Sequence, residues 1–319
     1  MQPLEGTLVV DFTRYLPGAF ASRELNRLGA RVVRVEPPAG DPMRQTATAW
    51  DTALRTGSES VTCDLPGDAG FAQALCARAD VVIEGFRPGV AARLGVGPGD
   101  VAASTVYCSI TGFGDHGLHR LRAGHDVNYL GWAGILEDTP QLPPTQVADL
   151  AAGALGAVTQ ILAGLLERAR TGEGPRITVS MTHRAHDLVA YRVGGEPVPR
   201  LLTGGLACYR IYETADGRHL TVGALEPKFF TRLCELVDRT DLVERQYDEA
   251  QETLGAELAS VFAARTLADW LAHFDGEDVC IGPVSTREEA AAAFGSPAAP
   301  RVVPLGAHTD AWRAKLGVH

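Results

Sequence analysis

The first 110 residues alternate short runs of branched apolar residues with longer segments whose apolar positions recur at helical spacing. Short Val- and Ile-rich runs predict buried strands, and the segments between them predict helices. Strands that alternate with helices form a parallel sheet with right-handed crossovers. The pattern predicts an α/β fold whose large domain is doubly wound and Rossmann-like. The expected strands are Thr7–Phe12, Arg31–Val35, Asp80–Glu84 and Thr105–Ile110, and the expected helices are Pro17–Leu28 and Val90–Leu94.

The pattern changes in the second half of the chain. Two strand-like runs, Tyr209–Glu213 and His219–Gly223, flank an Asp-Gly turn and predict a β-hairpin. Three helices should follow, at Pro227–Val237, Ala250–Ala264 and Leu267–Phe274. We therefore expect a large domain at 1–181, a linker at 182–207, a smaller α+β domain at 208–284 and a C-terminal return segment at 285–319.

One stretch, Leu150–Leu166, is apolar enough to suggest a membrane span, but Thr159 and Gln160 interrupt it and small residues fill its first part. This composition favours a buried helix. The chain carries 29 Lys and Arg against 39 Asp and Glu, a net charge of −10. Such a surface repels polyanions, so we expect neither a nucleic-acid partner nor a membrane. Any anionic ligand must be held by local arginines or helix ends.

The N-terminal segment and the cysteine spacing bear on the cellular compartment. No basic region precedes an apolar run at the N-terminus, and the six cysteines are singly spaced. We expect a cytoplasmic protein with reduced thiols. The histidines near residues 116–125 and 183–186 lack the closed ligand set of a zinc site, so we expect no metal. No GxGxxG motif follows the first strand, which removes the dinucleotide-binding fingerprint.

Three polar residues stand in unusual settings. Glycines surround His125, which allows a ligand to approach the backbone closely. Asp149 opens an apolar helix of small residues, and Glu226 lies between a strand and a helix. Aspartate and glutamate are also common at helix starts, so helix capping is the alternative interpretation for both acids.

Six segments, taken in chain order, resemble the family III CoA-transferases (CaiB/BaiF type) and above all their α-methylacyl-CoA racemase branch. They are LEGTLVVDFTRYLPGAF, VIEGFRPGVAARLGVGP, CSITGFGDHG, RAGHDVNYLGWAGIL, VADLAAGAL and YETADGRHLTVGALEPKFF, and the resemblance runs from about Leu4 to Pro283. The resemblance implies an interlocked homodimer, in which each active site lies between the large domain of one subunit and the small domain of its partner.

The same resemblance implies the roles of individual residues. His125 in the GHD-x-NY motif and Asp149 in the V-x-D motif would be the acid/base pair. Glu226, in the G-A-x-EP motif, would hydrogen-bond the histidine. The implied residues for the thioester and for CoA are Arg34, Arg93, Ala123, Gly124, Asp126, Asn128 and Tyr129.

These residues predict a racemase or epimerase that moves a proton at the α-carbon of a 2-methylacyl-CoA or another 2-substituted acyl thioester. No cofactor is expected, since CoA enters as part of the substrate. Three alternatives stay open. The first is a CoA-transferase with Asp149 as nucleophile, the second an enolate-forming isomerase or dehydratase acting on a carrier-bound or other non-CoA thioester, and the third a non-catalytic thioester-binding module.

The sequence departs from the family where the nucleotide end of CoA is usually held. Where most members of the family carry basic residues, this chain has Pro37, Ser58, Glu59 and Pro66. Either Arg34, Arg44 or Arg55 supplies the missing charge from nearby, or the acyl group arrives on the phosphopantetheine of a carrier protein.

Overall fold

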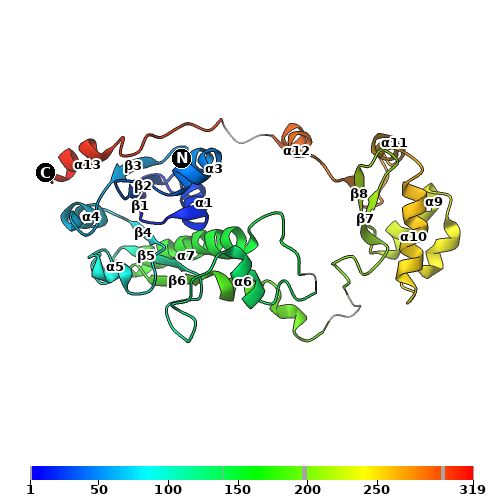
Figure 1. Ribbon diagram of the computed structural model, residues 1–319, viewed down its shortest axis with the longest axis horizontal. Helices are drawn as coiled ribbons and strands as arrows, with labels where there is room; N and C mark the ends of the chain where they lie inside the picture. The colour runs from blue at the N-terminus through cyan, green and yellow to red at the C-terminus, as the bar shows by residue number, and fades with distance from the viewer. Residues whose placement is uncertain (1, 139, 196–199, 296–298, 319) are drawn as a thin grey trace. The chain divides into compact units, whose positions relative to one another are not determined.

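The computed structural model describes residues 2–138, 140–195, 200–295 and 299–318. The chain divides into two compact units, one formed by residues 1–193 with 299–319 and the other by residues 194–298 (Figure 1). Each unit has its own hydrophobic core.

The large unit is built on a parallel sheet of six strands in the order β3-β2-β1-β4-β5-β6. The order reverses between β1 and β4, and ligands of doubly wound sheets bind at the carboxyl ends of the strands near such a switch point. The strands are β1 (Leu8–Asp11), β2 (Arg31–Glu36), β3 (Glu59–Thr62), β4 (Val81–Glu84), β5 (Val106–Thr111) and β6 (Arg176–Ser180).

Helices cover both faces of this sheet, because successive strand residues point to opposite sides. Val9 and Val32 lie in one core, whereas Val10 and Val33 lie in the other. The first core also takes residues from α1 (Tyr15–Arg27), α6 (Asp126–Trp132), α7 (Gly156–Thr171) and α8 (Met181–Asp187). The second takes residues from α4 (Ala69–Cys76), α5 (Val90–Arg93) and α13 (Thr309–Leu316). The short helices α2 (Met43–Thr46) and α3 (Thr48–Arg55) pack near α1. The predicted doubly wound α/β domain is confirmed.

The apolar helix begins earlier than expected and in an unusual form. Residues Val147–Leu155 form a π-helix, η1, which continues directly into α7. The combined helix is long and apolar enough to cross a membrane by length and composition alone. However, Ala148, Ala152 and Ile161 lie in the core beside the sheet. The interpretation as a buried helix is therefore confirmed.

The linker begins later than predicted. Helix α8 and a short 3-10 helix (Ala190–Arg192) occupy the first part of the expected linker and belong to the large unit. The Ser180 hydroxyl caps α8 by accepting the His183 N–H, and the His186 ring lies 3.0 Å from the carbonyl oxygen of Ala133. Residues 196–199 of the expected linker lie outside the described residues. The return segment is also divided, because residues 299–319 rejoin the large unit, where Trp312 is buried.

The small unit is an α+β domain with a three-stranded antiparallel sheet in the order β7-β8-β9. The hairpin of β7 (Tyr209–Glu213) and β8 (His219–Gly223) has its predicted bounds. The third strand, β9 (Ile281–Pro283), has three residues, too few for a sequence pattern. The helical elements are α9 (Pro227–Leu236), a 3-10 helix (Thr240–Arg245), α10 (Gln251–Phe262), α11 (Leu267–His273) and α12 (Arg287–Phe294).

A buried ion network lies beneath the turn from β1 to α1. Arg55 places Nη1 3.1 Å from Glu36 Oε1 and Nη2 3.2 Å from Asp41 Oδ2. Arg34 also approaches Asp41, at 3.3 Å. Burial raises the pKa of Glu36, but the hydrogen bonds from Arg44 and the charge of Arg55 outweigh it and hold that pKa at about 2. The network consists of Asp11, Arg34, Glu36, Asp41, Arg44, Asp51 and Arg55.

The network fixes the β1–α1 turn. Asp11 accepts the Thr13 N–H at 2.7 Å, and Asp41 accepts the Tyr15 N–H at 3.1 Å. Tyr15 has a φ of 65°, which non-glycine residues rarely adopt, so the bond to Asp41 helps to hold a strained conformation. Gly18 completes the turn, since a Cβ there would lie 1.9 Å from Thr13 Oγ1.

We expect Arg55→Met to lower the free energy of unfolding by about 3–5 kcal/mol, because it removes the ion pair of buried Asp51 and one of the two cations that neutralise Glu36 and Asp41. Arg27→Met is the matched control, since Arg27 is 69% exposed in its pair with Glu24. That change should cost less than about 0.5 kcal/mol. Urea unfolding measures both variants. Equal effects of the two substitutions would contradict a structural role for the network.

Candidate active site

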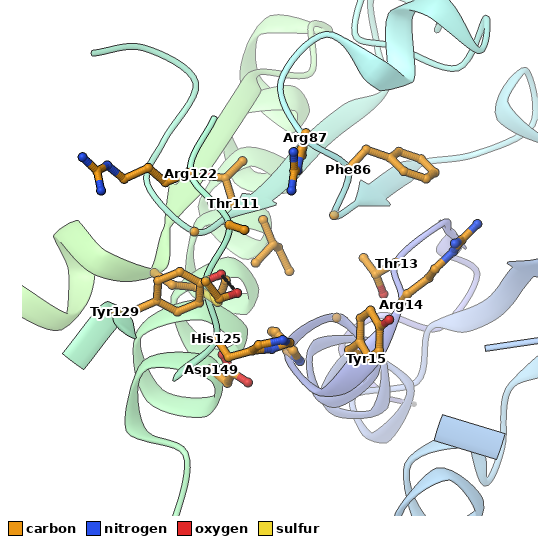
Figure 2. A pocket seen from close by; sticks show the side chains of 18 of the residues that line it. Thr13, Arg14, Tyr15, Phe86, Arg87, Thr111, Arg122, His125, Tyr129 and Asp149 are labelled. Atoms are coloured by element: carbon orange, nitrogen blue, oxygen red, sulfur yellow. Dashed lines mark hydrogen bonds between the residues drawn. The ribbon is translucent and has the colours of Figure 1, made fainter. Parts of the chain in front are cut away.

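A cavity of about 530 Å³ lies at the carboxyl edge of the large sheet. The loops after β1, β4 and β5 form part of its wall, so it is at the switch point of the strand order. The segment that leads into α6, residues of α1, α6 and α8, and Asp149 of η1 also line it (Figure 2). Its charged and titratable side chains are Arg14, Tyr15, Arg87, Arg120, Arg122, His125, Tyr129 and Asp149.

His125 is positioned by the start of helix α6. It has an extended backbone as the N-cap residue, and its N–H donates to the Asn128 side-chain oxygen at 3.0 Å. The Tyr129 hydroxyl donates to the Gly124 carbonyl at 2.6 Å and so ties the preceding loop to the helix. The imidazole of His125 is exposed and lines the cavity.

The glycines around this segment have a packing reason. A Cβ on Gly112 would lie 2.6 Å from the Tyr129 ring, and one on Gly124 would lie 2.8 Å from it. Both glycines therefore allow the tyrosine to close the floor of the cavity, where its ring packs edge-on against Phe113 with ring centroids 5.3 Å apart.

Asp149 is not a helix cap. It is the third residue of the π-helix, and Gln146 precedes that helix, so the capping interpretation is wrong. The Asp149 N–H donates to Asp126 Oδ1 at 2.8 Å. Burial, and secondly the negative charge of Asp126, raise the pKa of the Asp149 carboxyl group to about 7. Near neutral pH this group is therefore present in both its acid and its carboxylate form.

The structure brings most of the sequence-predicted residues to this one cavity. Figure 2 draws His125 and Asp149 on one side of it and Arg14 and Tyr15 on the other. The predicted residues in its lining are Ala123, Gly124, His125, Asn128, Tyr129 and Asp149.

Four predicted residues, Arg34 among them, lie outside this lining. Asp126 is absent from the lining but contacts Asp149, as described above. Arg93 is exposed on α5 and does not line the cavity. Glu226 is exposed at the start of α9 in the small unit. There, Gln246 Nε2 donates to the carbonyl of the preceding Leu225 at 2.8 Å. The binding role of Arg93 and the catalytic role of Glu226 stay predictions.

The structure corrects the prediction for Arg34. Its side chain is 1% exposed and faces Asp11 and Asp41, so it has no surface to offer a ligand. Arg55 is 2% exposed in the same ion network, so it too has no surface to offer a ligand. Arg44 is 16% exposed and paired with Glu36, and its supply of charge to the nucleotide end stays a prediction.

Four arginines in the lining were missed by sequence reasoning. Arg14 follows β1 and Arg87 follows β4, the two strands that flank the switch point. Because ligands of doubly wound sheets bind at the carboxyl ends of such strands, their positions in the sequence were a usable signal. Arg120 and Arg122 come from the loop before α6, where no strand marks their position. The Arg122 guanidinium lies 5.2 Å from the centroid of the Trp132 ring.

The arrangement combines an imidazole, a carboxyl group with a neutral-range pKa and several guanidinium groups. It suits proton transfer on a ligand that carries negative charge elsewhere. Within the described parts of the chain, no group of three His, Cys, Asp or Glu residues is arranged to hold a metal ion.

Known proteins resemble this chain in sequence and in fold. A sequence model of CoA-transferase family III matches residues 4–305. The crystal structure of Rv3272 from Mycobacterium tuberculosis, in its orthorhombic form, has a TM-score of 0.83 at 28% identity and covers 98% of this chain and 99% of that chain.

Two kinds of enzyme are among the similar curated proteins. Human alpha-methylacyl-CoA racemase is 35% identical over 309 residues, which cover 90% of this chain and 78% of that protein. Mouse succinyl-CoA:glutarate CoA-transferase is 30% identical over 322 residues, which cover 91% of this chain and 73% of that protein. The match of the family model over nearly the whole length shows that this chain belongs to CoA-transferase family III.

Proposed function

We propose that this protein is a racemase or epimerase that moves the α-proton of a 2-methylacyl or other 2-substituted acyl thioester. The observation that carries the proposal is Asp149, a partly buried carboxyl group with a pKa of about 7 in the same cavity as His125. Inversion at a carbon needs a base on one face and an acid on the other, and an imidazole and a carboxyl group can each take either role.

The proposed reaction begins with neutral His125 and protonated Asp149. The imidazole takes the α-proton from one face of the thioester, and the electron pair moves onto the carbonyl oxygen to give an enolate. Asp149 then gives its proton to the α-carbon from the opposite face. The cycle leaves an imidazolium and a carboxylate, which is the starting state for the opposite enantiomer. A pKa of about 7 lets the Asp149 carboxyl group act as acid or as base near neutral pH.

Glu226 completes the proposed site from a partner subunit. The resemblance to the racemase branch motivates this arrangement, and the exposure of Glu226 at the start of α9 leaves its carboxylate accessible to a second chain. A carboxylate on the imidazole would fix its tautomer and stabilise the imidazolium. We propose a homodimer for this reason.

CoA transfer is the second candidate, because similarity to mouse succinyl-CoA:glutarate CoA-transferase supports it. Asp149 would then attack the thioester as a carboxylate and form a mixed anhydride, which expels the CoA thiolate. His125 has no necessary role in that reaction. The two candidates therefore differ in whether His125 is required.

Single-base variants test the racemase proposal. In deuterium oxide, His125→Ala and Asp149→Asn should each lower inversion of a 2-methylacyl thioester by at least about 100-fold. Each variant should still exchange the α-proton, with retention, from the one enantiomer that faces its remaining base. Chiral chromatography and mass spectrometry measure both quantities. His116→Ala, whose side chain is 93% exposed, is the control and should keep full activity. Full inversion by either single-base variant would refute the assignment.

The pH dependence tests the electrostatics of Asp149. In His125→Ala, exchange of the α-proton from the enantiomer that faces Asp149 requires the Asp149 carboxylate, so its rate should rise with pH through about 7. Adding Asp126→Asn removes a neighbouring negative charge and keeps an oxygen acceptor, so this inflection should move to lower pH. It should stay above the ordinary aspartate value, because burial is the larger cause. An unmoved inflection would show that Asp126 does not tune Asp149.

Co-expression of differently tagged chains tests whether each active site is formed by residues of two chains. A mixed dimer of His125→Ala and Glu226→Ala chains has one intact site if Glu226 acts on the partner's histidine. The purified mixed dimer should then regain about half of the wild-type rate, although each parent dimer is impaired. An impaired mixed dimer would place both residues of a site in the same chain.

A further inference from the structure

The junction between β8 and α9 carries Glu226, and side chains rather than backbone groups hold it. Ala224 and Leu225 lie between the end of β8 and Glu226. Ala224 is buried and Leu225 is half-buried, so their carbonyl oxygens need donors from within the fold. In the described parts of the chain, no backbone N–H donates to either oxygen. The donors must therefore come from side chains.

The buried side chain of Gln246 supplies donors to both carbonyl groups. Gln246 directly follows the 3-10 helix Thr240–Arg245. Its Nε2 donates to the Ala224 carbonyl at 3.1 Å and to the Leu225 carbonyl at 2.8 Å. The NH2 end of the amide must face these oxygens, because only that end can donate to both. Gln251 holds Gln246 in turn, since its Nε2 donates to the Gln246 carbonyl at 3.1 Å.

Tyr247, the next residue, provides a further donor to the same junction. Its hydroxyl donates to the Leu225 carbonyl, which thus accepts from two consecutive side chains. Burial raises the pKa of this hydroxyl, with smaller contributions from Cys208 and Glu226. The hydroxyl therefore stays protonated, and remains a donor, throughout the neutral range.

The Glu226 carboxylate is not used by its own helix. Glu226 is the N-cap residue of α9, but its side chain makes no capping hydrogen bond, so the capping interpretation is wrong for this acid as well. Its backbone carbonyl accepts the N–H groups of Phe229 and Phe230, at 3.0 and 3.2 Å. The helix thereby fixes the backbone after Glu226, while Gln246 and Tyr247 fix the backbone before it.

We propose that Gln246 and Tyr247 are positioning residues, which orient the Glu226 carboxylate by holding the two carbonyl groups that precede it. The inference rests on the proposed function, in which Glu226 hydrogen-bonds the partner's His125. A hydrogen bond weakens steeply as its angle departs from linear. A rotation of the peptide groups before Glu226 would therefore weaken the bond to the imidazole without removing the carboxylate. Neither positioning residue needs to contact the substrate.

The pKa of His125 reports whether the Glu226 carboxylate is in position. In Asp149→Asn, exchange of the α-proton requires neutral His125, so its rate rises with pH through the imidazole pKa. A carboxylate hydrogen-bonded to the imidazole stabilises the imidazolium and raises that pKa. Adding Glu226→Gln should therefore move the inflection to lower pH, and adding Gln246→Met or Tyr247→Phe instead should move it in the same direction. Mass spectrometry of exchange in deuterium oxide measures each inflection.

Steady-state kinetics in the otherwise wild-type protein separate positioning from substrate binding. Gln246→Met should lower kcat for inversion about tenfold and change KM less than about twofold. Tyr247→Phe removes one hydroxyl group and should lower kcat about threefold. In a Glu226→Gln background, each substitution should lower kcat by less than about twofold, because the carboxylate that it positions is gone.

Thr214→Val is the matched control. Thr214 is buried, and its hydroxyl lies 2.6 Å from Asp216 Oδ1 and 3.0 Å from the Arg218 carbonyl, at the opposite end of the β7–β8 hairpin from Glu226. This substitution removes a buried hydroxyl from the same unit, but it should leave both kcat and the inflection unchanged. Tyr247 is exposed, so Tyr247→Phe tests the proposal even if Gln246→Met destabilises the fold.

The outcomes distinguish this proposal from the proposed function. Inflections that stay in place in both Gln246→Met and Tyr247→Phe, while Glu226→Gln moves the inflection, would overturn the positioning role alone. Equal losses of kcat with and without the Glu226 carboxylate would also overturn it. An unmoved inflection in Glu226→Gln would instead contradict the proposed role of Glu226, and absence of exchange in Asp149→Asn would contradict the base role of His125.

Discussion

Three arginines and four carboxylates pair with one another beneath the turn from β1 to α1, and the active-site cavity depends on that pairing. Asp11 and Asp41 hold the backbone of Thr13 and Tyr15, and that turn carries Arg14 to the wall of the cavity. Burial within the network also keeps Arg34 and Arg55 from any ligand. The four arginines in the cavity lining, Arg14, Arg87, Arg120 and Arg122, are not part of the network.

Hydrophobic periodicity and turn residues predicted the elements that depend mainly on neighbouring residues in the sequence. Alternating apolar runs located the core strands, and an Asp-Gly turn located the β7–β8 hairpin with its bounds. The missed parts depend on tertiary contacts. The three residues of β9 are a strand because they pair with β8, which is distant in sequence, and α13 is anchored by burial of Trp312. The π-helical start of the Asp149 helix has no signature in residue types.

Site residues that belong to sequence motifs could be predicted from the sequence. Arginines whose role depends on ion pairing in the folded chain could not. His125, Asp149 and the residues around them line one cavity, as the resemblance led us to expect. Arg34 was assigned to a ligand because a sequence does not reveal which arginines are buried. The pKa of Asp149 also arises from the folded chain, since burial and the charge of Asp126 raise it together. That shift makes the carboxyl group suited to acid/base exchange near neutral pH.

The most direct test of this account uses the wild-type protein and one enantiomer of a 2-methylacyl thioester in deuterium oxide, first without and then with an acceptor carboxylate such as succinate. NMR spectroscopy follows the α-position, and mass spectrometry follows the acyl carrier. The account predicts that one deuterium enters the α-position and that stereochemical purity is lost at the same rate in both mixtures. A thioester that keeps its α-proton without the acceptor and transfers its CoA to succinate when the acceptor is present would contradict it.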